Sequence, residues 1–338
     1  MREVAVIILN WNGEHHLLEF LPSVVASTPR EVDIIVADNG STDGSVQMLA
    51  SNFPEVEIIS LDRNYGFAQG YNLALNSLDY KYFVLLNSDV KVTHDWLPPL
   101  IQTLEEYSDY AAVAPKVLSY QQPTHFEHAG AAGGFIDYLG YPLCRGRVMG
   151  RVESDDGQYN DPRDIFWASG AVFACRAELF KSMGGFDPHF FAHMEEIDLC
   201  WRMQLAGYTI RYQPQSVVYH LGGGTLKVDS ARKRYLNHRN NLWMLLRCAP
   251  LPQLLVAVIL RPPLDTIAAF SYLLQGSVAS FVAPLRAYIS TLCSLPRLLR
   301  ERHQIRSSRL CESRCVVPRS IILDTLLHRG VASKNFKF

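Results

Sequence analysis

The sequence has few cysteines, and their spacing is unlike that of a metal site or a redox motif. Among 338 residues there are seven cysteines, an odd number. The two closest, Cys311 and Cys315, have no second pair of ligands near them, so neither a zinc site nor a redox motif is expected. Scattered reduced thiols are typical of a protein of the cytosol.

A long apolar run is missing from the amino terminus. The segment MREVAVIILNWNG has an apolar run of only six residues before Asn10. This run is shorter than the apolar region of a signal peptide. We interpret it as the first strand of a globular domain.

The sequence also has almost no net charge, but its charges are unevenly distributed. The formal charge is −1 at pH 7. Residues 1–226 contain 14 Lys and Arg against 28 Asp and Glu, whereas residues 227–338 contain 18 against 5, which gives net charges of −14 and +13. Such a division indicates an acidic front part and a basic tail with different partners. With 48% hydrophobic residues the chain can bury a sizeable core, and no nucleic-acid partner is expected.

The first 90 residues alternate between apolar strands and helical spacing. Strands are expected at 4–9, 32–38, 56–61 and 82–89, and helices at 14–27, 44–53 and 66–78. Apolar strands joined by helices are typical of a parallel sheet that is covered on both faces. A glycine-rich and acidic middle segment has no clear period, and we expect loops and short strands there.

Each of these strands ends on polar residues of the same kind. The first ends in Asn10, Trp11 and Asn12, the second in DNGSTDGS from Asp38, the third in DRNYGFAQGYN, and the fourth in Asn87, Ser88 and Asp89. Turn chemistry alone explains one such strand end, since Asn, Ser and Asp favour turns. Four in succession predict a ligand crevice at the carboxyl edge of the sheet.

Five motifs carry a resemblance to a known family. The segments VIILNWNG, VADNGSTDGS, NYGFAQGYN, LLNSDV and HMEEIDLCWR resemble the large inverting glycosyltransferase family of GT-A fold (glycosyltransferase family 2), in particular its bacterial rhamnosyltransferase-like branch. The resemblance runs from about residue 3 to about 247. It implies an α/β GT-A fold with a mostly parallel central sheet, and a nucleotide-sugar donor.

The resemblance also implies roles for residues of the donor crevice. Asp38 would accept a hydrogen bond from the nucleobase, and Asn10 would line the nucleotide site. The glycine-rich helix start would let the backbone approach the ribose and diphosphate; the residues concerned are Gly66, Gly70 and Asn72. Packing at a helix start is the alternative for the two glycines.

The triplet at residues 87–89 stands where the family has its DxD motif, whose carboxylates hold a divalent cation, Mg²⁺ or Mn²⁺, against the donor diphosphate. This sequence has Asn87 in place of the first Asp, so Asp89 is the expected metal ligand and Asn87 a nucleotide contact. His220, after the strand SVVYH, would bind the metal or the diphosphate.

The family has Glu-Asp-x-Asp where this sequence has Glu195, Glu196 and Asp198. The resemblance makes Glu196 the general base, with Glu for Asp adding one methylene. Helix capping together with an ion pair between Asp198 and Arg202 is the alternative for part of this cluster. The acceptor side is expected to be formed by Glu195, Asp198, Trp167, Ser169 and Gly170. Trp167 could instead belong to the core, and Ser169 and Gly170 to a tight turn.

After residue 247 the composition changes. We expect a GT-A domain at 1–247 and a basic, apolar, helical region at 248–338. Residues 266–285 carry no charge and are long enough to span a bilayer. Ser, Gln, Gly and Pro dilute this run, which favours amphipathic helices that lie in the membrane interface. A spanning helix and a soluble helical subdomain are the alternatives.

The resemblance thus implies an inverting, metal-dependent glycosyltransferase. It would move a sugar, with dTDP-rhamnose as the favoured donor, to a hydroxyl of a lipid-linked or polysaccharide acceptor. We expect it in the cytoplasm, bound peripherally to anionic lipid on the inner face of the membrane; its oligomeric state is left open. The alternative is a non-catalytic protein of the same fold that binds nucleotide sugar or scaffolds a glycan assembly complex.

Overall fold

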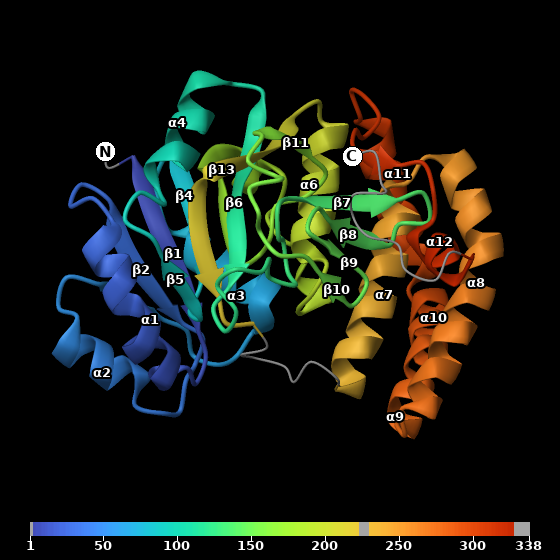
Figure 1. Ribbon diagram of the computed structural model, residues 1–338, viewed down its shortest axis with the longest axis horizontal. Helices are drawn as coiled ribbons and strands as arrows, with labels where there is room; N and C mark the ends of the chain where they lie inside the picture. Colours follow the sequence, from blue (N-terminus) through green and yellow to red (C-terminus); the bar gives the residue numbers. More distant parts are fainter. Residues whose placement is uncertain (1–2, 223–229, 328–338) are drawn as a thin grey trace.

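The computed structural model describes residues 3–222 and 230–327. Figure 1 shows a large sheet with helices beside it, a small second sheet next to α6, and a group of carboxy-terminal helices on the far side of that small sheet. The predicted division at residue 247 falls at the end of the first helix of this group, and residues 328–338 lie outside the described residues.

The large sheet contains nine strands in the order β11-β13-β6-β12-β4-β1-β2-β3, with β5 paired to β13. Its strands are β1 (Val4–Asn10), β2 (Asp33–Asp38), β3 (Glu57–Ser60), β4 (Tyr82–Asn87), β5 (Val90–Val92), β6 (Tyr110–Ser119), β11 (Arg163–Ile165), β12 (Val172–Arg176) and β13 (Thr209–His220). The first four strands along the chain, β1 to β4, are parallel, as predicted. β12 is antiparallel to both β4 and β6, so the whole sheet is mixed. The strands β4, β1 and β2 are neighbours, and their carboxyl ends form the predicted edge of the sheet.

Helices cover both faces of this sheet. Successive side chains along a strand point to opposite faces, so apolar strands such as β1 contribute to a core on each face. Val4, Val6 and Ile8 of β1 belong to the core on one face, and Ala5 and Ile7 to the core on the other. The first face is covered by α1 (Glu14–Ser27), α2 (Ser45–Asn52) and α4 (Pro98–Glu106), and the second by α3 (Gly66–Asn76), α5 (Ala177–Ser182) and α6 (Glu195–Leu205). The helices predicted at 14–27, 44–53 and 66–78 correspond to α1, α2 and α3.

The middle segment forms short strands and loops, as predicted. A second sheet has the order β10-β9-β8-β7-β14. Its strands are β7 (Gly134–Asp137), β8 (Pro142–Cys144), β9 (Arg147–Val148), β10 (Arg151–Val152) and β14 (Val316–Val317). Because β14 comes from the carboxy-terminal region and pairs with β7, that region is joined to the α/β part through a shared sheet.

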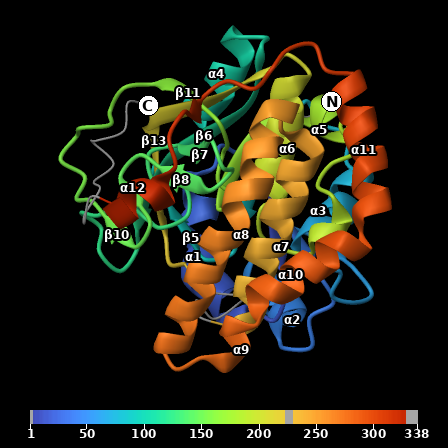
Figure 2. The ribbon, with the colours of Figure 1, turned by 90° about the vertical axis from the view of Figure 1, so that its right-hand side faces the viewer.

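The carboxy-terminal helices pack as a further layer outside α6 and the second sheet (Figure 2). They are α7 (Ala231–Cys248), α8 (Leu251–Leu274), α9 (Val278–Phe281), α10 (Ala283–Cys293), α11 (Leu295–Ser307) and α12 (Ile321–Leu327). Leu254, Leu264 and Leu298 belong to the same buried core as α3 and α6. The helical layer therefore shares its core with the α/β part.

Buried polar contacts hold this layer in place. The carboxylate of Asp265 accepts hydrogen bonds from Tyr141 (3.0 Å) and Tyr288 (2.8 Å) and lies 3.5 Å from the guanidinium of Arg261. Arg261 also donates to the carbonyl oxygen of Leu139 (3.0 Å). Partners of this kind compensate the cost of burying charge. One side of α8 is thus fixed to the protein.

The uncharged stretch 266–285 is not one helix, so it does not form the spanning helix considered above. α8 ends at Leu274, and Gly276 has a positive φ of 81° that breaks the chain direction before α9. Within the described residues, α8 alone is long and apolar enough to cross a membrane as a single helix, and a third of its most apolar part is buried in the protein. The other side of α8 exposes large apolar residues, including Leu255, Ile259 and Phe270.

Candidate active site

The carboxyl ends of β1 and β2 form the floor of the predicted crevice. The side-chain amide of Asn10 donates to Asp38 Oδ1 at 3.0 Å, and the backbone N–H of Ser41 donates to Asp38 Oδ2 at 2.9 Å. These two donors fix the Asp38 carboxylate in one orientation. Asn10 is fully buried and orients Asp38, the residue that is expected to bind the nucleobase.

Asp89 and His220 meet at the other side of this edge. Asp89 follows β4 and His220 ends β13, and their side chains lie 3.1 Å apart, from His220 Nε2 to Asp89 Oδ1. On the other side of the imidazole, Nδ1 lies 3.3 Å from Glu127 Oε2. All three side chains are buried. The structure thus brings together the two predicted metal ligands and adds a carboxylate, Glu127, that the sequence did not reveal.

The charges of this cluster depend on one another. Burial lowers the pKa of His220, but the carboxylates of Asp89 and Glu127 outweigh burial and raise it to about 10. Burial raises the pKa of Asp89, and the contact with His220 reverses this effect, so its pKa lies below the usual range. The pKa of Glu127 is lowered in the same way. The imidazole therefore carries a proton at neutral pH, between two carboxylates.

These residues fit a divalent cation. A carboxylate oxygen and an imidazole nitrogen are ligands that suit Mn²⁺, and the oxygen also suits Mg²⁺. Asp89 and His220 present one of each within 3.1 Å, and a cation would take the place of the proton on His220. Within residues 3–222 and 230–327, no group of three or more His, Cys, Asp or Glu side chains is arranged to hold a metal by itself. Asn87 is half-buried, and its backbone N–H donates to the carbonyl oxygen of Ala171 at 3.0 Å.

Glu196 lies at the amino-terminal start of α6, close to the carboxyl end of β4. A Cβ atom added to Gly170 would lie 3.9 Å from Glu196 Cδ and 3.5 Å from the ring of Phe67, so the absence of a side chain at Gly170 leaves space in front of the carboxyl group. Ala171, the next residue, is the hydrogen-bond partner of Asn87. Glu196 and the segment 87–89 therefore both lie next to residues 170–171.

The environment of Glu196 favours a proton acceptor. Burial raises its pKa to about 7, although backbone N–H groups at the helix start act in the opposite direction. Its Oε2 atom is buried and makes no hydrogen bond within the described part of the chain. A carboxyl group with a pKa near the working pH is suited to general-base catalysis.

The loop before α6 is held by a residue of α7. The side-chain amide of Asn240 donates to three carbonyl oxygens, those of Phe190 (3.0 Å), Ala192 (2.9 Å) and His193 (2.7 Å). The loop ends at Met194, which has a positive φ of 71° directly before the helix. Backbone in this region costs free energy in a residue other than glycine. Asn240 offsets that cost and so positions the start of α6.

Gly66 and Gly70 lie where neighbouring protein atoms leave no room for a side chain. A Cβ atom at Gly66 (φ 79°) would lie 2.6 Å from the ring of Phe191, and one at Gly70 would lie 2.9 Å from the amide of Asn39. The carbonyl oxygen of Phe191 also accepts the backbone N–H of Phe67 at 2.8 Å. The start of α3 is therefore covered by protein. This agrees with packing at a helix start, the alternative considered for the two glycines.

Asn72 is also predicted wrongly as a nucleotide contact. Its amide nitrogen donates to the carbonyl oxygen of Phe186 at 2.7 Å, and its oxygen accepts the backbone N–H of the same residue at 3.0 Å. Both ends of the amide are thus used to join α3 to Phe186, in the segment that precedes the loop before α6. The helical spacing in the sequence places Asn72 correctly on α3 but does not determine which way it faces.

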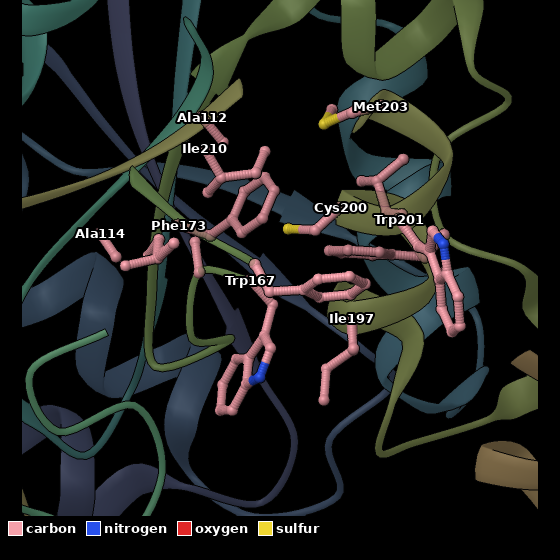
Figure 3. Packing of buried hydrophobic residues seen from close by; sticks show 14 of the residues in the cluster. Ala112, Ala114, Trp167, Phe173, Ile197, Cys200, Trp201, Met203 and Ile210 are labelled. Atoms are coloured by element: carbon pink, nitrogen blue, oxygen red, sulfur yellow. The ribbon is translucent and has the colours of Figure 1, made fainter. Parts of the chain in front are cut away.

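Four of the five residues expected on the acceptor side point into the protein. Trp167 is part of the core, where its indole N–H donates to the carbonyl oxygen of Phe135 at 2.9 Å; Figure 3 shows it among buried neighbours that include Ile197 and Cys200. The hydroxyl of Ser169 donates to the carbonyl oxygen of Ala129 at 2.7 Å. Trp167 and Ser169 are thus corrected to structural roles, and only Gly170 lies at the site.

The two acidic neighbours of Glu196 are structural as well. Asp198 is fully buried and accepts a hydrogen bond from Arg202 Nε at 2.8 Å, which is the ion pair considered as the alternative. Glu195 is buried, and its pKa is raised well above the usual range by burial and by the adjacent Glu196. Glu195 is therefore enclosed by protein, where burial favours its protonated form, and it does not face an acceptor.

Sequence reasoning missed Glu127, Phe191 and Asn240. Glu127 lies in the glycine-rich middle segment, where no period points to it. Asn240 had a signal, because it occupies an apolar position in a helix, four residues after Leu236 and four before Met244. A polar residue at such a position indicates a buried hydrogen-bonding role.

The fold and this edge of the sheet define a nucleotide-sugar transferase of GT-A type. Residues 5–191 match the family model for glycosyl transferase family 2. The chain belongs to this family, and it is a glycosyltransferase of glycan biosynthesis.

Among characterised relatives, the chain is 25% identical over 258 residues to the N-acetylglucosaminyl-diphospho-decaprenol L-rhamnosyltransferase of Mycobacterium tuberculosis (strain ATCC 25618 / H37Rv), which covers 70% of this chain and 81% of the relative. It is 20% identical over 243 residues to the low-salt glycan biosynthesis hexosyltransferase Agl10 of Haloferax volcanii, covering 70% of this chain and 74% of the relative. The predicted membership of this family, in its rhamnosyltransferase-like branch, is thus confirmed.

Solved structures share the fold. S. aureus TarS 1–349 in complex with UDP-GlcNAc has a TM-score of 0.57 at 15% identity, over 90% of this chain and 88% of that one. The mannosyltransferase PcManGT from Pyrobaculum calidifontis, in complex with GDP-Man and Mn²⁺, has a TM-score of 0.53 at 15% identity, over 97% and 88%. GalNAc-T7 with UDP, GalNAc and Mn²⁺ has a TM-score of 0.56 at 18% identity, over 73% of this chain and 48% of that chain. The predicted GT-A fold is confirmed.

Proposed function

We propose that the protein is an inverting, metal-dependent glycosyltransferase that moves a sugar from a nucleotide sugar to a hydroxyl group of a lipid-linked or polysaccharide glycan. The favoured donor is dTDP-rhamnose, since one relative is an L-rhamnosyltransferase and the match with this chain covers 81% of that relative. That relative's name also describes an acceptor in which a sugar is linked through a diphosphate to a polyprenol.

Glu196 is the general base of this reaction. It accepts the proton of the acceptor hydroxyl while the hydroxyl oxygen forms a bond to the anomeric carbon. The bond from that carbon to the donor diphosphate breaks on the opposite face, so the anomeric centre is inverted in one displacement. Gly170 leaves the space that the acceptor sugar needs, and a positioned base of this kind contributes about 10²–10⁴-fold to the rate.

Asp38, with Asn87 nearby, binds the nucleoside part of the donor. Asp89 and His220 would hold a divalent cation, which neutralises the charge of the departing diphosphate. Glu127 holds the imidazole of His220 from the other side, where the two groups lie 3.3 Å apart. Such an outer carboxylate fixes the orientation of a ligand histidine.

The carboxy-terminal helices place the enzyme at a membrane surface. The outer side of α8 exposes Leu255, Ile259 and Phe270 by more than half of each side chain, and residues 227–338 carry a net charge of +13. Apolar residues among acyl chains and basic residues near anionic headgroups are the two terms of interfacial binding. We propose peripheral association with the cytoplasmic face of the cell membrane.

The observation that carries this function is the position of Glu196 beside Gly170, one residue from the contact between Ala171 and Asn87. It places a carboxyl group with a pKa of about 7 next to the strand end that leads to Asp89.

The test is release of nucleoside diphosphate from candidate sugar nucleotides, with dTDP-rhamnose and the UDP-hexoses first, with Mn²⁺ and after chelation by EDTA. We expect slow, metal-dependent release without acceptor and fast release with a lipid-linked acceptor. A protein that binds sugar nucleotides but cleaves none of them, with or without acceptor, would be the non-catalytic binding protein considered above.

A further inference from the structure

A cavity of about 590 Å³ lies between α7, the segment from α9 to α10, and the loop before α6. Its wall contains three arginines, Arg232 and Arg239 of α7 and Arg286 of α10, together with the rings of Phe191 and Tyr235. The rest of the wall is aliphatic. These arginines belong neither to the proposed donor site nor to the proposed site of proton transfer.

In the described part of the chain, the three arginines have no carboxylate partner. Within residues 3–222 and 230–327, no Asp or Glu oxygen lies within 4.0 Å of the guanidinium nitrogens of Arg232, Arg239 or Arg286. Their guanidinium groups lie over aromatic rings instead: Arg232 over Phe191 at 4.8 Å, and Arg286 over Tyr235 at 5.1 Å. Like charges gathered around one cavity repel each other. An anion between them would be stabilised by all three.

Guanidinium groups are particularly suited to phosphate, because their N–H groups match two phosphate oxygens at once. Arg239 is already oriented, since it donates to the carbonyl oxygens of His189 (2.9 Å) and Phe190 (3.0 Å). Arg232 and Arg286 have exposed side chains, which can turn toward a ligand without disturbing the core. A phosphate or diphosphate group fits this charge distribution better than a single carboxylate does.

Two exposed apolar side chains adjoin residues of the cavity wall. Val278, 65% exposed, directly precedes the wall residue Ala279, and Leu285, 59% exposed, directly precedes Arg286. Figure 2 shows α9 at the turn between α10 and α8, and the outer side of α8 also exposes large apolar residues. A ligand here would have an anionic group at the arginines and an aliphatic chain along the exposed apolar surface.

The cavity borders the catalytic region through Phe191. This residue lines the cavity on one side, and on the other its ring lies against Gly66. Its carbonyl oxygen accepts the N–H of Phe67, the residue whose ring lies at Gly170 beside Glu196. The donor diphosphate is assigned to Asp89 and His220, so the arginine cavity is available to a different phosphate.

We infer that this cavity binds the diphosphate and the first isoprenoid unit of the acceptor lipid, with Arg232, Arg239 and Arg286 holding the diphosphate. The inference rests on the proposed function, because it assigns the acceptor's lipid diphosphate to a site separate from the donor's. The sugar that the lipid carries then reaches Glu196 past Phe191.

The test is binding of farnesyl diphosphate to the full chain in detergent, measured by calorimetry. We compare Arg232→Gln and Arg286→Gln with the control Arg300→Gln, an exposed arginine of α11 outside the cavity wall. Loss of one charge-assisted contact to phosphate weakens binding by about 10-fold or more. Each cavity variant should show this loss and the double variant about 100-fold, while Arg300→Gln stays within about twofold of the parent.

Three competitors decide what the cavity recognises. Farnesol and inorganic diphosphate should each bind at least 10-fold more weakly than farnesyl diphosphate, because each lacks one half of the ligand. A nucleoside diphosphate with Mn²⁺ should not displace it. Equal binding by inorganic diphosphate, displacement by the nucleotide, or unchanged affinity in both arginine variants would overturn the inference.

Release of nucleoside diphosphate without acceptor is measured on the same samples. It does not require an occupant of the cavity, so Arg232→Gln and Arg286→Gln should keep it at the parent rate while the KM for a lipid diphosphate-linked acceptor rises. If the parent releases no nucleotide but still binds farnesyl diphosphate in an arginine-dependent way, the proposed function fails and the assignment of the cavity stands.

Discussion

Glu196→Gln is expected to make the protein more stable and nearly inactive at the same time. The folded protein raises the pKa of Glu196 from 4.5 to about 7, so the folded state resists loss of this proton. Below pH 4.5 the group is protonated in both states and has no effect on stability. Between pH 4.5 and 7 the unfolded chain loses its proton more readily, so the free energy of unfolding falls as the pH rises.

The size of the effect follows from the shift. One pKa unit corresponds to 1.36 kcal/mol, so an ionised Glu196 costs up to about 3 kcal/mol at pH 8. Because the side chain keeps some contact with water, this figure is an upper limit. The amide of Gln carries no charge and avoids this cost, so Glu196→Gln should unfold at a higher urea concentration at pH 8 and at nearly the parent concentration at pH 4.

Transfer should respond in the opposite direction. The parent needs ionised Glu196, so its kcat/KM should rise with pH to a plateau above about 7. Glu196→Gln should lower turnover by about 10²–10⁴-fold and remove this rise, while donor binding stays unchanged. Glu195→Gln is the matched control, since Glu195 is buried beneath the site and should keep transfer within a few-fold. A rise near pH 7 that persists in Glu196→Gln, or turnover within a few-fold of the parent, would refute the assignment of the base.

Three further substitutions test other parts of the molecule. Asp89→Asn should lower transfer by at least 100-fold and abolish the Mn²⁺-dependent increase in Tm caused by a nucleoside diphosphate; an active variant that still requires Mn²⁺ would exclude Asp89 as the ligand. Asn240→Ala removes the donor to three carbonyl oxygens of the loop before α6 and should lower the free energy of unfolding by about 2 kcal/mol, with a larger fall in kcat than in donor affinity; a normal kcat would show that the loop does not position Glu196. Ile259→Asp combined with Phe270→Asp should reduce sedimentation with anionic vesicles by at least 10-fold, whereas Leu18→Asp on α1 should not, and equal binding by both would place the membrane contact elsewhere.

Much of the fold could be predicted from local patterns in the sequence. The strands and helices of the first 90 residues have clear periods of two and 3.6 residues, and the structure has them within a few residues of the predicted bounds. The order of polar strand ends was equally informative, because carboxyl ends of parallel strands meet at one edge. Asp38 and Asp89 lie there, as predicted from their positions after β2 and β4.

The sequence could not show which way a residue on a known element faces. Asn72 is on the predicted helix, but both ends of its amide bind the backbone of Phe186. Trp167 is near the site in sequence and in the core in space, because Gly134 leaves room for its ring. Such outcomes depend on segments that are distant in the chain, and no local period reports them.

The sequence by itself thus determined the strands and helices of the first 90 residues, the crevice edge and the acidic cluster at residues 195–198. Only the tertiary structure distinguished the three acids of this cluster: Glu195 and Asp198 are enclosed by protein, whereas Glu196, the proposed base, faces the space beside Gly170. It also decided that His220 stands between Asp89 and Glu127, and that Phe191 and α7 line a cavity that contains three arginines. Burial and charge are set by neighbours in space, and these neighbours come from strands and helices up to 131 residues apart in the chain.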